Sequence, residues 1–417
     1  MRREAGGIAV VMETGAKIDR RQWLAGAVAV SGAAVLGTTK SFAADSTVSL
    51  PFANGDRPLV QYPGKRPMIR LTARPPQLET PFEVFNEGAF TPNDAFFVRY
   101  HLAGLPTFID PDTYKIAVGG KVATPLSLSL GDLKTGFEPV ELVAVNQCSG
   151  NSRGFVTPRV GGGQLGNGAM GNARWKGVKL SDVLNKAGVA AGAVQVKFDG
   201  LDSPVLPGTP DFAKALDIDH ALDGEVMIAY EMNGEDLPFL NGYPVRLVVP
   251  GYYGTYWMKH LSEITVLDSV YDGFWMSTAY RVPDNDCHCV DPGTKPQKTV
   301  PIGKFDVRSF MTNLRDGQTV RSGRVALKGI AFDGGAGISE VLVSADGGES
   351  WSPAALGPDL GKYSFREWTA SVHLKPGARA LAVRAVNRLN QTQPDKALWN
   401  PSGYMRNGVE TLTVNAA

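Results

Sequence analysis

The 417-residue chain has few cysteines, few histidines and almost no net charge. Its three cysteines are too few for a disulfide scaffold, and none lies in a C-x-x-C or C-x-x-C-H motif. This excludes the common zinc spacing and covalent haem attachment within this chain. The five histidines form no H-E-x-x-H motif. A net charge of +1 gives no overall reason to bind nucleic acid or an anionic membrane.

Long apolar runs are also lacking, and no segment reaches the 18 residues expected of a membrane span. The paired arginines Arg20 and Arg21 precede a short apolar run at residues 25–36 and then small residues at 41–45. This pattern predicts a cleaved twin-arginine export signal over residues 1–44, rather than a short membrane anchor. The mature protein is therefore expected in the periplasm, and this export route often carries proteins already folded around a cofactor.

Glycine (48) and proline (28) are plentiful, which favours many turns over a helical bundle. Residues 45–80 are rich in proline and predict an irregular, extended N-terminal arm. Residues 81–298 mix short strands and helices, with a helix expected at 181–188 and buried strands at 226–230 and 245–249. Residues 286–303 are typical of a linker, and residues 299–417 predict an all-β sandwich. Its expected strands are 325–330, 340–344, 368–374 and 380–386.

Cys148 is the residue whose surroundings point most clearly to chemistry. It follows a strand-like run at residues 141–145 and opens a loop of small polar residues that ends at Arg153. Glycine at position 150 allows a ligand to approach the backbone, and a nearby cation favours the thiolate that binds soft metals. Taken alone, Cys148 is equally compatible with a buried structural thiol.

Two further segments carry residues that could form a site with Cys148. The glycine-rich stretch at residues 161–175 can wrap a large organic cofactor, but it contains no phosphate-binding GxxxxGK[ST] motif. Alternation over residues 96–101 places Arg99 and His101 on one strand face. That face can bind an oxyanion or can simply be solvated.

Four motifs in order resemble the sulfite oxidase family of molybdenum enzymes, in particular the bacterial periplasmic sulfite dehydrogenases. They are residues 99–101 (RYH), 148–153 (CSGNSR), 173–178 (ARWKGV) and 243–251 (YPVRLVVPG). The resemblance extends from about residue 80 to the C-terminus. It implies an α+β fold, with a molybdopterin-binding catalytic domain over 81–298 and an immunoglobulin-like β-sandwich dimerisation domain over 299–417.

The resemblance also implies residue roles. In this family molybdenum is held by a molybdopterin dithiolene, oxo groups and one cysteine, so Cys148 is the expected metal ligand. The catalytic pocket is expected to contain Arg99, His101, Cys148, Arg153, Tyr280 and Arg406. The residues expected at the cofactor are Phe97, Arg99, His101, Cys148, Asp202, Asn241, Arg246, Trp257 and Lys259.

Some positions depart from the family pattern. Asn241 stands where animal relatives have a histidine, and Leu165 where many relatives have a pocket tryptophan. The animal enzymes place the arginine of the second domain nearer Trp399 than Arg406 lies. Cys287 and Cys289 have no counterpart in the animal enzymes, and three interpretations remain open: a metal or redox pair, a local disulfide, or two separate thiols.

The function implied is oxidation of sulfite to sulfate by oxygen-atom transfer. Since the chain has no haem motif, the expected electron acceptor is a separate cytochrome c, and the expected assembly is a homodimer. Two alternatives are a molybdopterin enzyme acting on another sulfur oxyanion or a sulfoxide, and a non-catalytic partner protein that retained the fold.

Overall fold

The structure is a computed structural model that describes residues 46–417. The predicted export signal lies outside the described residues. Within residues 46–417, no helix combines the length and apolar character needed to cross a bilayer. The helices are short: α1 (Leu130–Thr135), α2 (Leu180–Ala187), α3 (Ile218–Ala221), α4 (Phe274–Ser277) and the 3-10 turns η1 (Phe82–Asn86), η2 (Arg153–Phe155), η3 (Phe239–Asn241) and η4 (Gly254–Tyr256).

The N-terminal segment forms a sheet, so the prediction of an irregular arm over residues 45–80 was wrong. Five antiparallel strands follow one another in chain order: β1 (Ser46–Ser49), β2 (Asp56–Val60), β3 (Met68–Thr72), β4 (Gln77–Glu79) and β5 (Val98–Arg99). Its small core contains Met68, Leu78 and Tyr100. Prolines within β2 and between β3 and β4 obscured the alternating pattern in the sequence.

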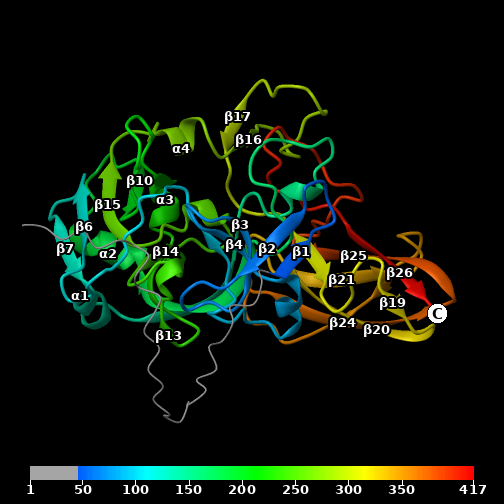
Figure 1. The fold of residues 1–417 in the computed structure, drawn as a ribbon. Coiled ribbons are helices and arrows are strands. Elements are labelled where there is room, and N and C mark those ends of the chain that lie inside the picture. Colours follow the sequence, from blue (N-terminus) through cyan, green and yellow to red (C-terminus); the bar gives the residue numbers. More distant parts are fainter. Residues whose placement is uncertain (1–45) are drawn as a thin grey trace, which may run out of the picture. The chain divides into compact units, whose positions relative to one another are not determined.

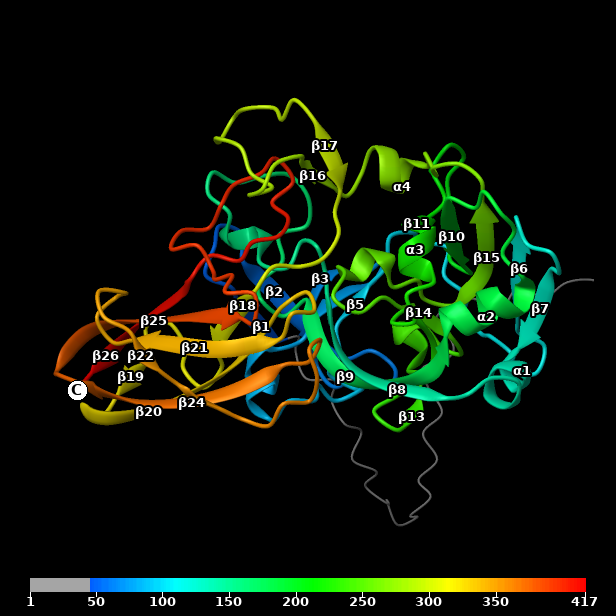
Figure 2. The same ribbon diagram turned by 180° about the vertical axis from the view of Figure 1, so that it is seen from behind.

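The catalytic domain contains two larger sheets (Figures 1 and 2). One has the order β11-β10-β15-β6-β7, with β6 (Lys115–Gly120), β7 (Leu126–Ser129), β10 (Gln195–Gly200), β11 (Lys214–Asp217) and β15 (Leu261–Leu267). The other has the order β13-β12-β9-β8, with β14 paired to β12. Its strands are β8 (Val140–Gln147), β9 (Met170–Lys179), β12 (Met227–Met232), β13 (Glu235–Asp236) and β14 (Arg246–Val248).

Most of the local predictions in this domain are confirmed. The strands expected at 226–230 and 245–249 are β12 and β14, and the helix expected at 181–188 is α2, which stops at Gly188 with φ of 71°. The helix starts one residue early, however, so Ser181 lies inside it and does not cap it. Only residues 161–168 of the glycine-rich stretch form a loop, because β9 begins at Met170 and is paired on both sides.

The predicted linker at residues 286–303 is partly ordered as a strand pair, because β17 (Thr299–Pro301) pairs with β16 (Arg281–Pro283).

Beyond it lies the predicted sandwich (Figure 1). One sheet has the order β18-β20-β24-β23, with β18 (Arg308–Met311), β20 (Gly323–Phe332), β23 (Ala355–Leu356) and β24 (Arg366–Leu374). The other has the order β19-β26-β25-β21-β22, with β19 (Thr319–Val320), β21 (Ile338–Ser344), β22 (Ser352–Pro353), β25 (Gly377–Asn387) and β26 (Glu410–Ala416). The four strands expected here are β20, β21, β24 and β25, and their inner faces bury a core around Trp368.

A buried ionic cluster ties the sandwich to the loop after Cys148. Arg308 is almost fully buried and donates to Glu410 at 2.7 Å and to the hydroxyl of Ser152 at 2.7 Å. Arg406 donates to the same Glu410 oxygen at 2.6 Å. Burial favours the neutral acid, but the two arginines outweigh it and hold the pKa of Glu410 below its ordinary value.

We predict that Glu410→Gln destabilises the protein by about 3–5 kcal/mol, because it leaves two buried arginine charges without a counter-charge. Urea unfolding of the purified protein, followed by tryptophan fluorescence, measures the change. Asp236→Asn is the matched control, since it breaks only an exposed pair with Lys134. That control should cost less than about 1 kcal/mol. Equal effects of the two substitutions would contradict a structural role for the cluster.

A second buried acid supports the loop at residues 161–168. Glu79, at the end of β4, accepts the backbone N–H groups of Gly166 at 3.0 Å and Gly168 at 3.3 Å. Burial raises the pKa of Glu79 to about 7, while the two N–H groups and Arg57 oppose the shift. The N-terminal sheet therefore holds this loop with a carboxyl group that titrates near neutral pH.

This shift predicts a pH dependence of stability. Because the folded-state pKa is raised, the folded protein binds more protons than the unfolded chain between about pH 4.5 and 7. The contribution of Glu79 to stability therefore falls as the pH rises through that window and stays low above it. We expect Glu79→Gln to gain stability relative to wild type between pH 5 and pH 8, measured by thermal unfolding. The exposed Glu83→Gln controls for the loss of one charge, and a pH-independent difference for Glu79→Gln would refute the assignment.

Candidate active site

Cys148 lies directly after β8 and is held by the sheet. Its N–H donates to the carbonyl of Ala169 at 2.9 Å, which extends the pairing of β8 with β9 by one residue. The chain then turns, and the N–H of Asn151 donates back to the carbonyl of Cys148 at 3.0 Å. The thiol is buried, and among the described residues it is the cysteine that forms no disulfide. The fold thus presents one fixed sulfur at the end of a central strand.

Arg153 is packed over the same turn. A side chain at position 150 would place its Cβ 2.7 Å from Nη1 of Arg153, so it would displace the guanidinium from this position. Arg153 donates from Nε to the carbonyl of Ser402 at 2.8 Å and from Nη1 to the carbonyl of Gly163 at 3.1 Å. Its position therefore depends on the sandwich domain as well as on the catalytic domain.

Two cavities meet at Cys148, and both are lined by Cys148, Arg99 and Tyr280. Counting the solvent at its mouth, the first has an empty volume of about 430 Å³ and the second of about 810 Å³, and both are partly open to solvent. The other residues that line the first cavity are Phe96, Phe97, His101, Asn146, Ser149, Leu240, Asn241, Arg246, Gly254, Thr255 and Lys259. The second is also lined by Arg57, Leu71, Thr72, Gln77, Gly150, Arg153, Gly162, Gly163, Gln164, Leu165 and Tyr404. The cysteine is thus accessible from two sides.

The first cavity is strongly cationic, and no Asp or Glu is among its lining residues. Burial lowers the pKa of Arg246 to about 9. Burial, with the charge of Arg246, lowers the pKa of Lys259 to about 7. Lys259 donates to the carbonyl of Arg99 at 2.7 Å, and Arg246 donates to the carbonyls of Asn241 at 2.8 Å and Trp257 at 3.3 Å. Cations desolvated to this degree are stabilised by an anion such as a phosphate.

The same cavity contains buried polar atoms without protein partners. On lining residues these are His101 Nδ1, Asn146 Oδ1, Ser149 Oγ, Arg246 Nε and Thr255 Oγ1. Unpaired buried polar atoms are costly and therefore rare. A ligand rich in donors and acceptors, with an anionic group near Lys259 and Arg246, would satisfy them. The residues present fit a molybdopterin, and the free thiol of Cys148 lies in the wall of the same cavity.

The other residues predicted at the cofactor lie near this cavity in different ways. Phe97 and Asn241 line it, and the Asn241 amide donates to the carbonyl of Phe97 at 2.9 Å. Trp257 does not line it, but its ring lies 5.5 Å from the Arg246 guanidinium. Asp202 is buried and does not line it either, although its charge partly offsets the low pKa of Lys259. Trp257 therefore packs near Arg246, and Asp202 acts on Lys259 through its charge, without either residue lining the cavity.

Lys65 is a cation at this site that the sequence did not reveal. Its ammonium is buried and donates to Asn241 Oδ1 at 2.6 Å and to the carbonyl of Phe96 at 2.9 Å. Burial lowers the pKa of Lys65 to about 7. Lys65 fixes the orientation of the Asn241 amide. Lys65 was missed because it lies in the segment interpreted as an irregular arm.

Tyr280 and His101 form a pair between the two cavities. The Tyr280 hydroxyl lies 2.5 Å from His101 Nε2 and 3.5 Å from Arg99 Nη2. Burial and nearby cations keep the pKa of His101 well below its usual value, so the imidazole is neutral. Nδ1 of His101 has no partner. A buried N–H without a partner is less tolerable than an unpaired acceptor, so we assign the proton to Nε2. Nε2–H then donates to the Tyr280 oxygen and leaves the phenol proton free for a ligand.

The sandwich contributes Tyr404, and not Arg406, to the second cavity. The ring of Tyr404 stacks on that of Tyr280, with centroids 5.4 Å apart and an interplanar angle of 11°. The Arg153 guanidinium lies 4.8 Å from the Tyr404 centroid. Arg406 lines neither cavity and is paired with Glu410. The sequence predicted Arg406 in the pocket, but in the structure Tyr404, two residues earlier, lines the cavity, because register within an irregular segment cannot be read from spacing.

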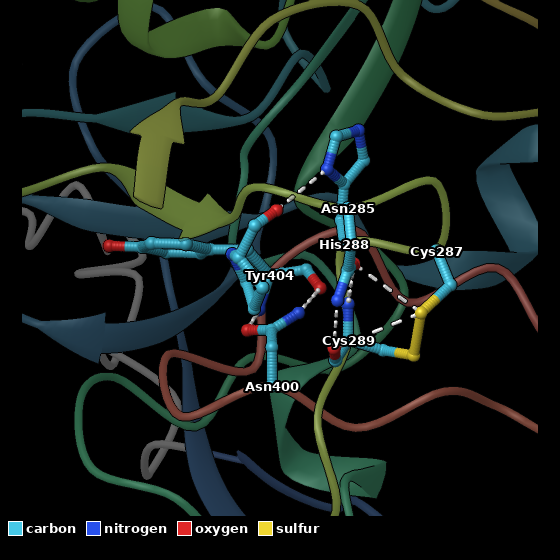
Figure 3. The surroundings of a disulfide bond; sticks show 7 residues. Asn285, Cys287, His288, Cys289, Asn400 and Tyr404 are labelled. Atoms are coloured by element: carbon cyan, nitrogen blue, oxygen red, sulfur yellow. Dashed lines mark hydrogen bonds between the residues drawn. A yellow bond between two sulfur atoms is a disulfide. The ribbon is translucent and has the colours of Figure 1, made fainter. Parts of the chain in front are cut away.

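Of the three interpretations of Cys287 and Cys289, the structure contains the local disulfide (Figure 3). The described residues contain no group of three or more His, Cys, Asp or Glu arranged to hold a metal. The disulfide loop contacts the segment that carries Tyr404, because the N–H of Val290 donates to the carbonyl of Trp399 at 3.0 Å. Asn400 in turn donates to the carbonyl of Tyr404 at 2.8 Å, as Figure 3 shows.

Two family models match the chain. Residues 102–275 match the oxidoreductase molybdopterin binding domain, and residues 299–415 match the Mo-co oxidoreductase dimerisation domain. A solved structure, the sulfane dehydrogenase SoxCD from Paracoccus pantotrophus, has a similar fold. Its TM-score is 0.69 with 22% identity, and the match covers 93% of this chain and 96% of that one.

Curated relatives are more similar in sequence. Mitochondrial sulfite oxidase from Macaca fascicularis is 35% identical over 88% of this chain and 69% of its own length. The human enzyme is 35% identical over 86% of this chain and 67% of its own length, and sulfite oxidase from Gallus gallus is 33% identical over 84% and 78%. These matches, with the molybdopterin-binding and dimerisation domains in the same order, confirm the resemblance seen in the sequence. The chain belongs to the sulfite oxidase family of molybdenum oxidoreductases.

Proposed function

We propose that the protein oxidises sulfite to sulfate with a molybdenum ion held by molybdopterin and Cys148. The observation that carries this proposal is the position of Cys148 between two cavities that share Arg99 and Tyr280. Such a metal centre supplies oxygen-atom transfer and two-electron redox chemistry when bound. In the net reaction, sulfite and water give sulfate, two protons and two electrons. The curated relatives that are named sulfite oxidases support this choice of substrate.

The second cavity supplies what a small sulfur oxyanion requires. Arg99 and Arg153 provide charge-assisted donors on the side of Cys148 that faces solvent. Burial keeps the pKa of Tyr280 above its usual value, so its phenol stays protonated and can donate to the bound oxyanion. His101 remains neutral and orients that phenol. These residues bind and position the substrate without themselves being oxidised.

The two electrons require an acceptor, for which we propose a separate cytochrome c, because the chain contains no haem-attachment motif. We further propose a periplasmic location, supported by the twin-arginine pattern and by a disulfide, which persists in oxidising compartments. A homodimer is supported by the match to a dimerisation domain. Another sulfur oxyanion or a sulfoxide is the alternative substrate.

Cys148→Ser tests the metal assignment. We expect stoichiometric molybdenum in wild type, and in the variant loss of sulfite-dependent cytochrome c reduction, because a hydroxyl is a poor ligand for a soft metal. Far-UV circular dichroism should not change, since the backbone hydrogen bonds of residue 148 are retained.

Three outcomes would overturn the proposal. Purified wild type without stoichiometric molybdenum would refute the cofactor. Full turnover by Cys148→Ser would refute the ligand. Activity toward sulfoxides but not toward sulfite would refute the substrate.

Tyr404→Ala tests the contribution of the sandwich to the pocket. We expect KM for sulfite to rise about 10-fold with little change in kcat, because Arg153 loses a cation–π contact and Tyr280 a stacking partner worth together about 1–2 kcal/mol. Tyr404→Phe keeps the ring and should stay within about 3-fold of wild type.

Arg406→Gln is the discriminating variant for the same pocket. It should lower stability through Glu410 while leaving KM near the wild-type value. If Arg406→Gln raises KM and Tyr404→Ala does not, the residue expected from the sequence contributes to the pocket and Tyr404 does not.

A further inference from the structure

The wall of the second cavity includes residues from the N-terminal sheet. Arg57 on β2, Thr72 on β3 and Gln77 on β4 line it together with the residues around Cys148. All three lie outside residues 102–275 and 299–415, the segments that match the family models. None of them lines the first cavity. This wall therefore comes from a different sheet than the strand β8 that leads to the cysteine.

Arg57 is fixed in place without a direct ion pair, although its charge reaches the buried Glu79 and opposes the rise in the pKa of that acid. It donates to the backbone carbonyls of Asn54 at 2.6 Å, Asp56 at 2.9 Å and Gln164 at 3.3 Å. Within residues 46–417 it forms no ion pair with a carboxylate. Those three carbonyls hold a guanidinium at the cavity wall at little further entropic cost, which is the arrangement expected of a preorganised anion site.

The cavity has the charge and the space for a second anion. Arg57, Arg99 and Arg153 line it, and no Asp or Glu does. The cavity and the solvent at its mouth together have an empty volume of about 810 Å³, which leaves room for more than one small anion. Arg99 is shared with the first cavity, whereas Arg57 is not. The positive charge is thus spread between a position at Cys148 and a position at the N-terminal sheet.

We propose that Arg57, with Gln77 and Thr72, forms an outer site for a sulfur oxyanion, distinct from the reaction position at Cys148. The site takes a small dianion or monoanion with several acceptor oxygens. Its occupant is either sulfite on its way in or sulfate on its way out, and the naming of these two anions rests on the proposed function. An anion held there lies in the same cavity as the Cys148 sulfur.

The test measures anion binding without turnover. Sulfate and sulfite are titrated separately by calorimetry, at low ionic strength, into the holoenzyme that carries Cys148→Ser. One of the two anions should occupy the outer site. We expect Arg57→Ala to weaken the binding of that anion at the outer site about 10-fold, and Arg57→Lys to weaken it less. Arg159→Ala is the matched control: this exposed arginine also holds the N-terminal hairpin, through the carbonyl of Ala53 at 2.9 Å, but lines neither cavity.

Steady-state kinetics of the Arg57 variants, with Cys148 intact, provides a second measurement. If the outer site holds incoming sulfite, Arg57→Ala raises KM at unchanged kcat. If it holds sulfate, Arg57→Ala weakens sulfate inhibition instead. Gln77→Leu replaces Arg57→Ala if that variant fails to fold, and its expected effects have the same direction.

The inference is overturned if neither anion binds more weakly to the Arg57 or Gln77 variants than to the Arg159 control. It is also overturned if each anion binds at a single position that is insensitive to residue 57. Because binding is measured without turnover, failure of the protein to oxidise sulfite would refute the proposed function and leave this test intact.

Discussion

The site is governed by positive charge that has been removed from water. Arg246 is buried and Lys259 half-buried beside one cavity, Lys65 is buried behind it, and no acidic side chain lines that cavity. Their lowered pKa values express the cost of keeping cations without an anionic partner. An arrangement of this kind opposes folding unless an anion binds, so the fold and its anionic cofactor are energetically linked. The selection of phosphate and oxyanion ligands follows from the same charge.

The sandwich domain participates in this site through contacts that reach the loop of Cys148. Arg308 holds the hydroxyl of Ser152, Ser402 accepts from Arg153, and Tyr404 covers the Arg153 guanidinium. The cavity in front of the cysteine therefore takes its shape from two domains. The ion pairs of Glu410 with Arg308 and Arg406 hold the sandwich side of this interface, and Arg308 links them to the turn after Cys148.

The sequence predicted those features that depend on local patterns. Alternation located the sandwich strands, and the position of Cys148 after a strand and before a glycine turn follows from neighbouring residues alone. Contacts between distant segments could not be predicted in this way. Tyr404 reaches the pocket because Asn400 shapes an irregular segment, and Lys65 reaches Asn241 across 176 positions of the chain. Neither contact leaves a periodic signal, and Arg406 was chosen because its charge suited the pocket and not because its position was known.

The N-terminal sheet shows why the missed residues matter chemically. Its five strands place Lys65 behind the first cavity, Glu79 beneath the loop of Leu165, and Arg57 at the wall of the second cavity. Leu165, on the loop that Glu79 holds, lines the same cavity as Arg57. The width of this cavity and the number of cations along it therefore depend on the N-terminal sheet as well as on the turn after Cys148. Because width and charge decide how long an anion stays near the cysteine, the N-terminal sheet helps to determine which anions this pocket holds.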